Sequence, residues 1–410
     1  MKHKIFYIFS NIILTGVGIL KSFIFLKYLN DLNLGLVAII QTIILLVSFL
    51  QLGLINGGYR IISVGDQVRN FEVNSLIHSF LCIVFFSLII ITWIGNVLIF
   101  KFNYTLIFIA LIIGFVQLFS TWVTNIFLGM SKLKEVNLLI IVSTLISLIL
   151  LPTVIFWGVY AAFFLLFIQP FSLVITSYIK YNFVRPKKFL LNKVIFFWIL
   201  KFGFIPFLAG ILGYLNLQIE RWSIVYWLGP DQLGKYYLAI TFTNIFLLIP
   251  NSINNLFFPN SMKFFSLGRH DLFVKVLKKF ITIIVFYSII AVILTLSLGE
   301  KVVGYLFPQH LESLKFVYLI IPSVVSMTFV LPINIFLNAS VRLKPMLIAY
   351  LTGMFIDAIS ILFFVYRNDF NLTKITLTQN IVNIYIFLFL LVSYYFIKNS
   401  IYKKEEILNI

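Results

Sequence analysis

The sequence predicts an all-α polytopic membrane protein, with twelve transmembrane helices in two six-helix lobes related by a parallel pseudo-two-fold repeat. Three observations predict this fold. First, 61% of the 410 residues are hydrophobic, 11% are charged and the mean hydropathy is +1.08, which leaves too little polar surface to cover a water-soluble particle. Second, long apolar segments recur along the whole chain. Third, two stretches in the two halves of the chain echo each other.

A transmembrane helix needs roughly 20 apolar residues, and the chain offers twelve such segments. In chain order they are 5–27, 35–58, 74–99, 103–129, 137–157, 159–180, 196–228, 236–258, 276–298, 316–338, 346–366 and 378–397. The first lacks the small-x-small cleavage site of a signal peptide, so we expect it to be retained as a helix. Gly53 and Gly57 form a GxxxG pair in the second segment, which favours close packing of helices.

The echo indicates an internal duplication. IFLGMSKLK, starting at Ile126, matches IFLNASVRLK, starting at Ile335, and the Leu-Gly dipeptide at Leu34 recurs at Leu233. The offset grows from 199 to 209 or 210 along the chain, as an old duplication with small loop insertions would leave it. Because each copy has an even number of spans, both insert in the same orientation, and transporters use two such lobes for alternating access across a central cleft.

The basic residues of the loops predict the orientation and the domain limits. With the N-terminus inside, the inner segments hold 21 of the 31 Lys and Arg residues and the outer loops hold 7, so both termini are expected to be cytoplasmic. We expect an N-terminal lobe at 1–182, a basic cytoplasmic linker at 183–195, a C-terminal lobe at 196–397 and a cytoplasmic tail at 398–410. The net charge of +18 then reflects topology and anionic lipid headgroups, and binding of nucleic acid is not needed to explain it.

Enzymatic functions find little support. The four His residues lie far apart without metal-ligand spacing, so no metal site is expected. The segment GPDQLGKY, Gly229 to Tyr236, has the skeleton of a phosphate-binding loop, but Tyr replaces the Ser or Thr that binds magnesium. A membrane glycosyltransferase or polymerase would need large outer loops with catalytic residues, whereas the outer loops here are short. We therefore expect a transporter without catalytic residues or cofactors, driven by a gradient or by its substrate.

Five ionisable residues fall inside the predicted spans: Lys21, Lys201, Glu220, Arg221 and Asp357. Since a charge at the bilayer centre costs roughly 2.5 to 3.5 kcal/mol, such groups usually face a wet interior or a partner. The repeat offset of 199 places Lys21 opposite Glu220, so a mainly cationic ring in the cleft would attract a phosphate or pyrophosphate. Asp357, nearest the middle of its span, is a candidate proton carrier. The alternatives are snorkelling for the two lysines and a structural ion pair for the adjacent acid and arginine.

Uncharged polar residues form two stripes at helical spacing. They are Gln117, Thr121 and Asn125 in the fourth span, and Asn244, Asn251 and Asn255 in the eighth. Such stripes either join helices through hydrogen bonds or line an aqueous cavity that accommodates sugars. Joining helices is the commoner explanation for any one stripe, and lining a cavity is the functional one.

Several segments resemble one family of transporters. LKFGFIPFLAGILGYLNLQIERWSIVYWLGPDQLGKYYLA, Leu200 to Ala239, resembles the seventh-helix signature of the polysaccharide-transport branch of the MOP superfamily. That signature has a Gly and a Pro near the helix start, an Asp-Arg pair, then LG and G-x-Y. IPNSINNLFFPNS, 249–261, and LGLINGGYR, 52–60, resemble the ends of the family's next helix and of its second helix. The departure is Glu220, where the family usually has Asp.

The resemblance implies a Wzx-type flippase, which moves an undecaprenyl-pyrophosphate-linked oligosaccharide, such as an O-antigen repeat unit for lipopolysaccharide, across the bacterial cytoplasmic (inner) membrane. The implied partners are this lipid-linked oligosaccharide, membrane lipids and other polysaccharide-assembly proteins such as the polymerase. Arg221 and Lys21 would then bind the anionic headgroup, Arg60 would contact it on the inner side, and Glu220 or Asp357 would couple transport to protons or ions. The main alternative is a multidrug exporter of the same superfamily, whose cationic substrates favour acids in the cleft. A peptidoglycan-precursor flippase is a second alternative, although that branch usually has fourteen spans.

Overall fold

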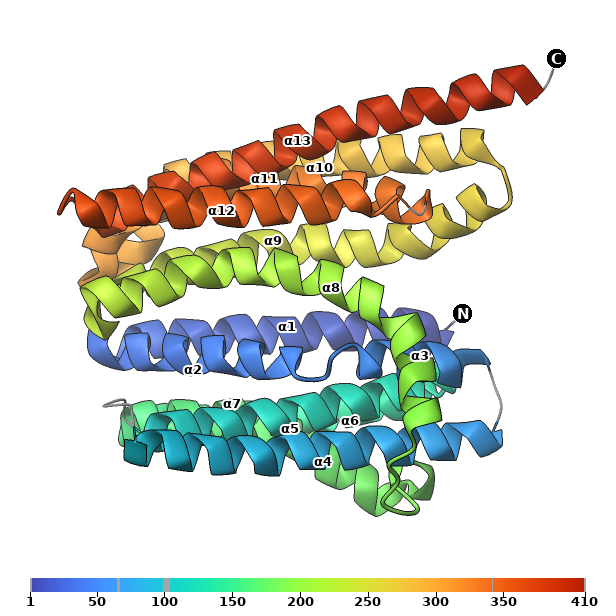
Figure 1. Ribbon diagram of the computed structural model, residues 1–410. Helices are drawn as coiled ribbons and strands as arrows, with labels where there is room; N and C mark the ends of the chain where they lie inside the picture. The colour runs from blue at the N-terminus through green and yellow to red at the C-terminus, as the bar shows by residue number, and fades with distance from the viewer. Residues whose placement is uncertain (1, 65–66, 99–103, 341, 409–410) are drawn as a thin grey trace. The chain divides into compact units, whose positions relative to one another are not determined.

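The computed structural model describes residues 2–64, 67–98, 104–340 and 342–408, and in these residues the chain forms helices and turns without a β-strand (Figure 1). The α-helices are α1 (Lys2–Tyr28), α2 (Asp31–Phe49), α3 (Leu54–Val64), α4 (Gln67–Leu98), α5 (Tyr104–Gly129), α6 (Leu133–Ile149), α7 (Thr153–Lys180), α8 (Lys193–Ser223), α9 (Pro230–Ser266), α10 (His270–Leu306), α11 (Leu314–Ala339), α12 (Lys344–Tyr366) and α13 (Leu372–Leu408). Short helices are η1 (Asn182–Val184), η2 (Ile224–Leu228) and η3 (Pro308–Ser313). The all-α membrane fold is thereby confirmed.

Each predicted span corresponds to a helix, with three differences. Among the described residues nine helices are long and apolar enough to cross a membrane, and α1, α6 and α8 complete the twelve. The second span is interrupted between α2 and α3, where Leu52 and Gly53 have positive φ angles of 51° and 89°. The fifth span ends at Ile149, earlier than predicted, and the next helix starts at Thr153, directly after Pro152, which lacks an amide hydrogen and does not continue a helix. The predicted gap at residue 158 is instead a non-helical Gly158 inside α7.

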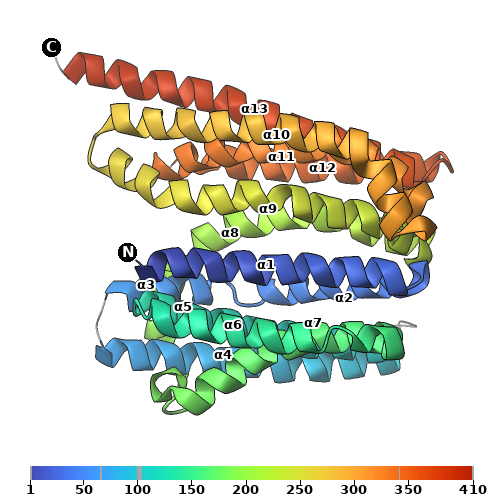
Figure 2. The ribbon, with the colours of Figure 1, turned by 180° about the vertical axis from the view of Figure 1, so that it is seen from behind.

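The contacts between Cα atoms divide the chain into two compact units, Met1–Ile211 and Leu212–Ile410. In the first unit α5 packs against α2, α3, α4 and α7, while α6 packs against α1 and α7. In the second unit α11 packs against α9, α10 and α13, while α12 packs against α13. Within each unit these helices run side by side in both views (Figures 1 and 2). The contacts of α11 with α9, α10 and α13 repeat those of α5 with α2, α4 and α7, and α12 packs against α13 as α6 packs against α7, as expected for duplicated copies.

The echoed sequences end their helices in the same way. At the end of α5 the Lys132 amide donates to the Phe127 carbonyl at 2.8 Å, and at the end of α11 the Arg342 amide donates to the Leu337 carbonyl at 2.9 Å. Both bonds close the six-residue turn that commonly ends an α-helix. Since the two pairs are related by the same shift in sequence, the echo marks equivalent points of the two units.

The boundary between the units falls inside α8, so this helix begins in one unit and ends in the other. Its Ile199 is fully buried in the core of the first unit, together with Trp122 and Phe127. A separate core in the second unit is built around Phe280, Ile284 and other apolar side chains of α10 to α13. By its contacts the predicted linker, 183–195, lies in the first unit, and the four predicted domain limits stay predictions.

The GxxxG pair lies in a close contact between α3 and the first half of α8. A Cβ atom on Gly203 would overlap the carbonyl oxygen of Gly53, and one on Gly57 would overlap the carbonyl oxygen of Ile199. Backbone therefore touches backbone here, which only glycine permits. This contact fixes the beginning of α8 to the first unit.

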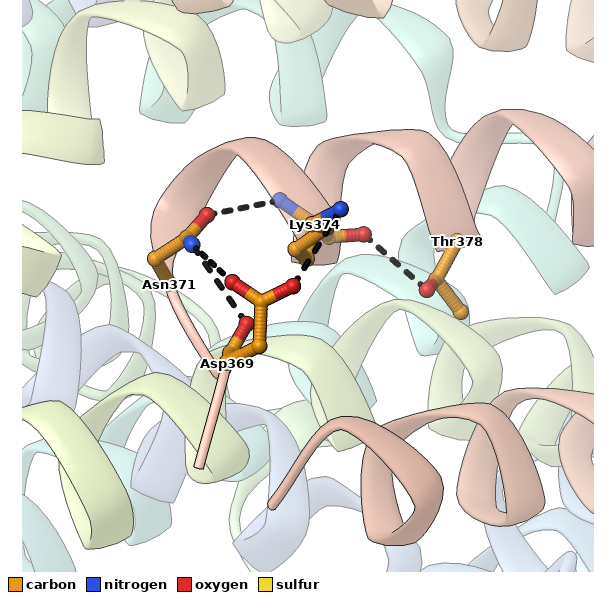
Figure 3. Close-up of polar contacts among 4 residues, drawn as sticks. All are labelled: Asp369, Asn371, Lys374 and Thr378. Atoms are coloured by element: carbon orange, nitrogen blue, oxygen red, sulfur yellow. Dashed lines mark hydrogen bonds and ion pairs between the residues drawn. The ribbon is translucent and has the colours of Figure 1, made fainter. Parts of the chain in front are cut away.

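The start of α13 is organised by a polar cap (Figure 3). The Lys374 amide donates to Asn371 Oδ1 at 3.1 Å, and Lys374 Nζ pairs with Asp369 Oδ2 at 3.3 Å. Thr378 Oγ1 donates to the Lys374 carbonyl at 3.0 Å. Exposed ion pairs contribute only about 0 to 1 kcal/mol, so the main effect of this cap is to fix where α13 begins.

Candidate functional site

The second unit buries two acidic side chains. Glu220 of α8 is 4% exposed and Asp357 of α12 is 5% exposed, and they are near enough to interact electrostatically. The Glu220 carboxylate lies beside the hydroxyl of Tyr236 from α9, which in turn lies beside Thr376 of α13. We call Glu220, Tyr236, Asp357 and Thr376 the acid cluster. Four helices thus contribute one side chain each.

The acid cluster contains oxygen atoms without hydrogen-bond partners. Among the described residues, neither Glu220 Oε1 nor the Tyr236 hydroxyl makes a hydrogen bond of ordinary geometry, although both are buried. A buried polar atom without a partner costs about 1 to 3 kcal/mol, and a buried carboxylate costs more unless a cation or a proton neutralises it. The cluster is therefore chemically suited to take up and release a small cation or a proton.

Arg221 lies at the side of the acid cluster. It is partly exposed and interacts electrostatically with Glu220 and with Tyr236 and Tyr237 of α9. Because consecutive helix residues do not face each other, the guanidinium and the Glu220 carboxylate leave α8 in different directions. Two buried acids and one arginine leave the region with a net negative charge when the acids are ionised.

An asparagine of α13 inserts into the backbone of α11 close to this region. Asn380 Nδ2 donates to the Leu319 carbonyl at 2.6 Å, and Asn380 Oδ1 accepts from the Ser323 amide at 3.0 Å. In a regular α-helix these two backbone groups bond to each other. Pro322, which lies between them, lacks an amide hydrogen and strains the preceding turn. The Asn380 side chain thereby takes the place of one backbone hydrogen bond of α11 and bonds to both of its groups.

The same polar network continues to α8. Asn383 Nδ2 donates to Ser323 Oγ at 2.7 Å, and Asn216 Nδ2 approaches Asn383 Oδ1 at 3.5 Å. No charge or stripe in the sequence singles out these residues, nor Tyr236 and Thr376. The available signal was the spacing of Asn380 and Asn383, which places two amides on one face of an apolar helix.

Replacing Asn380 with Leu is expected to destabilise the protein. It would leave the Leu319 carbonyl and the Ser323 amide without a partner inside the helix bundle, at about 1 to 3 kcal/mol for each group. We expect the unfolding temperature of the detergent-solubilised protein to fall by about 5 °C or more. Asn244→Leu, at an exposed amide of α9, serves as the control and should change it little. An unchanged temperature for Asn380→Leu would mean that α11 restores its own hydrogen bond.

Lys21 is buried in the first unit, with 6% of its surface exposed. Its ammonium group, on α1, donates to Gln169 Oε1 at 2.5 Å and to the Leu165 carbonyl at 3.5 Å, both on α7. Neither acceptor is a carboxylate, so the charge is solvated by an amide and a peptide group and is not neutralised by them. Gln169 was not among the predicted site residues, although it is a polar residue that stands before Pro170 in a long apolar span.

The remaining predicted site residues lie at exposed positions of one unit or the other. Arg60, on α3, is exposed, and its guanidinium lies 5.6 Å from the ring centre of Phe202. Gln117 and Thr121 of α5 and Asn244 and Asn251 of α9 are exposed, and Asn125 is partly exposed. The side chain of Asn255 lies outside the described residues. The structure thus brings Glu220, Arg221 and Asp357 together, and it places Lys21 and Arg60 in the first unit.

Comparison with known proteins reveals the fold. No protein-family model matches the chain, and no curated protein sequence matches it. Among solved structures, an inward-facing multidrug resistance MATE family transporter of the MOP superfamily is similar with a TM-score of 0.73 and 14% identity, over 95% of this chain and 96% of that one. The lipid II flippase MurJ in an inward closed conformation is similar with a TM-score of 0.72 and 14% identity, over 95% of this chain and 87% of that one.

A third structure is a MOP superfamily transporter from Pyrococcus furiosus, described as having a binding pocket of reversed polarity. It is similar with a TM-score of 0.67 and 15% identity, over 96% of this chain and 95% of that one. These neighbours are transporters and a flippase, not enzymes. The chain is therefore a multi-pass membrane protein with the fold of MOP superfamily transporters.

Proposed function

We propose that this protein is a flippase that moves an undecaprenyl-pyrophosphate-linked oligosaccharide, such as an O-antigen repeat unit, from the inner to the outer leaflet by alternating access. The fold is one on which both drug exporters and a lipid flippase are built, so the choice between them depends on the polarity of the residues in this chain. In this proposal the sugars and the pyrophosphate cross with the protein while the lipid tail stays in the bilayer.

The observation that carries the proposal is the buried ammonium of Lys21. Among the described residues its hydrogen-bond acceptors are an amide and a peptide carbonyl, and neither neutralises its positive charge. A multidrug exporter that carries cations would need negative charge in such a position, because a buried cation repels them. A pyrophosphate, by contrast, would be attracted by Lys21, by the partly exposed Arg221 and by the exposed Arg60.

The acid cluster supplies the coupling site in this proposal. Its buried carboxylates, Glu220 and Asp357, alternately bind and release a proton or a small cation, and the gradient of that ion drives the change between inward-facing and outward-facing states. A cation bound there would also satisfy the unpaired oxygens of Glu220 and Tyr236.

In this proposal the exposed polar side chains of α5 and of α9 bind the sugars. Gln117, Thr121, Asn244 and Asn251 are exposed, and amides and hydroxyls of this kind hydrogen-bond to sugar hydroxyls. The location that follows is the bacterial cytoplasmic membrane, with both termini cytoplasmic, where a polysaccharide polymerase would use the translocated unit.

Arg221→Ala tests the proposal directly. In proteoliposomes carrying a fluorescent undecaprenyl-pyrophosphate disaccharide, we expect the rate of translocation to fall by about tenfold or more, because a charge-assisted hydrogen bond contributes about 1.5 to 3 kcal/mol. Arg221→Lys should retain part of the activity. Lys201→Ala, at an exposed position of the same helix, is the matched control and should stay within about twofold of the native rate.

A normal rate for Arg221→Ala would remove this arginine from the substrate site. The competing function is a multidrug exporter, and it is tested with the same proteoliposomes and a cationic dye such as ethidium. Gradient-driven export of the dye, without movement of the pyrophosphate lipid, would replace the flippase proposal with that alternative.

A further inference from the structure

The segment 185–197, which we call the linker strap, is held against the first unit by hydrogen bonds. The Lys187 amide donates to Ser75 Oγ at 3.2 Å, and the Leu190 amide donates to Ser79 Oγ at 2.9 Å, both on α4. The two serines are four residues apart and therefore share one face of that helix. The non-helical part of the linker strap, residues 185–192, is thus held on the outside of α4, and residues 193–197 form the first turn of α8.

This conformation turns apolar side chains away from the protein. Leu190 packs against the core of the first unit, whereas its neighbours Phe189 and Leu191 are 67% and 61% exposed, because successive residues of an extended segment point to opposite sides. Val194 and Phe197, three residues apart at the beginning of α8, are also exposed, at 79% and 65%. We call these four exposed side chains the apolar edge of the linker strap.

Basic side chains lie along the same segment. Lys187, Lys188 and Lys193 are exposed, and Lys187 Nζ lies 3.6 Å from the ring centre of Phe71. No Asp or Glu occurs anywhere between Glu135 and Glu220, so no acid within that stretch neutralises them.

Lys193 also occupies the first position of α8, where the helix dipole makes a cation unfavourable and an anion favourable. The Asn192 side chain caps the helix there by accepting from the Val194 amide at 2.9 Å. The Lys193 ammonium and the positive end of the α8 dipole therefore lie at the same place. A bound anion would reduce the repulsion between them.

We propose that the linker strap is a binding surface for anionic phospholipids of the membrane. The lysines bind headgroup phosphates, and Phe189 and Leu191 insert among the outer parts of the acyl chains. Basic residues beside exposed aromatic and aliphatic side chains are the usual composition of segments that lie in an anionic membrane interface. A soluble phosphate compound would use the lysines but would leave the apolar edge in water. This inference does not depend on the proposed transport substrate.

The test measures binding of fluorescent phosphatidylglycerol and fluorescent phosphatidylcholine to the full-length protein in neutral detergent. We expect the native protein to prefer phosphatidylglycerol, and K187Q/K188Q/K193Q to weaken its binding by about tenfold, with phosphatidylcholine unaffected. The matched control is K275Q/K278Q/K279Q, which removes the same charge from three exposed lysines of α10 and should stay within about twofold. A second variant, F189S/L191S, should weaken binding of phosphatidylglycerol by at least about threefold.

Three results would overturn the proposal. If both lysine variants lose the same amount of phosphatidylglycerol binding, the lipid is attracted by the overall charge of the protein and not by a specific site. Unchanged binding in K187Q/K188Q/K193Q would remove the linker strap from lipid recognition. Pyrophosphate is also compared with sodium chloride at the same ionic strength as a competitor of the lipid. If pyrophosphate displaces the lipid when sodium chloride does not, and F189S/L191S binds the lipid like the native protein, the segment is a site for soluble polyphosphates. Unfolding temperatures equal to that of the native protein establish that the variants are folded.

Discussion

Glu220→Gln is expected to abolish gradient-driven transport. The amide has nearly the shape of the carboxylate, but it cannot take up and release a cation or a proton, so the acid cluster would keep only one of its two exchangeable carboxylates, Asp357. We expect accumulation of the fluorescent pyrophosphate-linked disaccharide in proteoliposomes to fall at least about 100-fold, to the level of protein-free liposomes. Asp357→Asn should act in the same direction.

The control for this prediction is Asp369→Asn. Asp369 is an exposed acid in the loop before α13, 52% exposed and paired with Lys374 at 3.3 Å, and its loss should leave transport within about twofold. Equilibrium binding of the disaccharide should stay within about threefold in Glu220→Gln, because the substrate site keeps its cations.

Folding offers a further check on Glu220→Gln. A buried charge that lacks a hydrogen-bonded counter-ion destabilises a protein. Replacing the Glu220 carboxylate with a neutral amide removes such a charge, so the unfolding temperature should not fall. Gradient-dependent transport at the native rate would exclude Glu220 from coupling. Lost transport together with a lowered unfolding temperature would mean that the carboxylate is structural.

The fold was largely predictable from the sequence because hydropathy and duplication report on it directly. All twelve spans correspond to helices, and the echo at Ile126 and Ile335 marks two helix ends with the same closing hydrogen bonds. The break at Leu52 and the early end of α6 were not predicted. Both occur inside stretches of high mean hydropathy, and the residues that break the helices there, Gln51 and Gly53 in one case and Pro152 in the other, lower that mean too little to divide the stretch.

The candidate site was predictable only where a charge interrupts an apolar span. Glu220, Arg221 and Asp357 stand out for that reason, and the structure groups them. Tyr236 and Thr376 were not predicted, because hydroxyl side chains are common in transmembrane helices and cost little free energy there. Asn380 was not predicted for a different reason. Its role is to bond to backbone groups of α11, and a pattern of side chains does not indicate which backbone groups lack a partner. Lys21 was predicted as an ionisable group, but its amide partner on α7 was not.

Gly203→Ala is expected to destabilise the protein more than any other single methyl addition in α8. The new Cβ would overlap the carbonyl oxygen of Gly53 and lie 2.5 Å from the Gly57 amide nitrogen. These are backbone atoms, so the overlap is relieved only by moving α3 away from α8. Overpacking typically costs about 1 to 3 kcal/mol, and contact with rigid backbone places this variant at the upper end. The unfolding temperature should fall by about 6 °C or more, with a lower yield of monodisperse protein.

The matched control lies one and a half to two turns further along the same helix. A Cβ on Gly210 would meet no atom within 4 Å, and Ala favours helix over Gly by about 1 kcal/mol, so Gly210→Ala should leave stability equal or slightly higher. Gly57→Ala should behave like Gly203→Ala, because its Cβ would overlap the Ile199 carbonyl. If Gly203→Ala unfolds at the native temperature, α3 and α8 are not in contact there. If it is destabilised, the beginning of α8 is anchored to the first unit, and any movement of the second unit during transport must be taken up further along this helix.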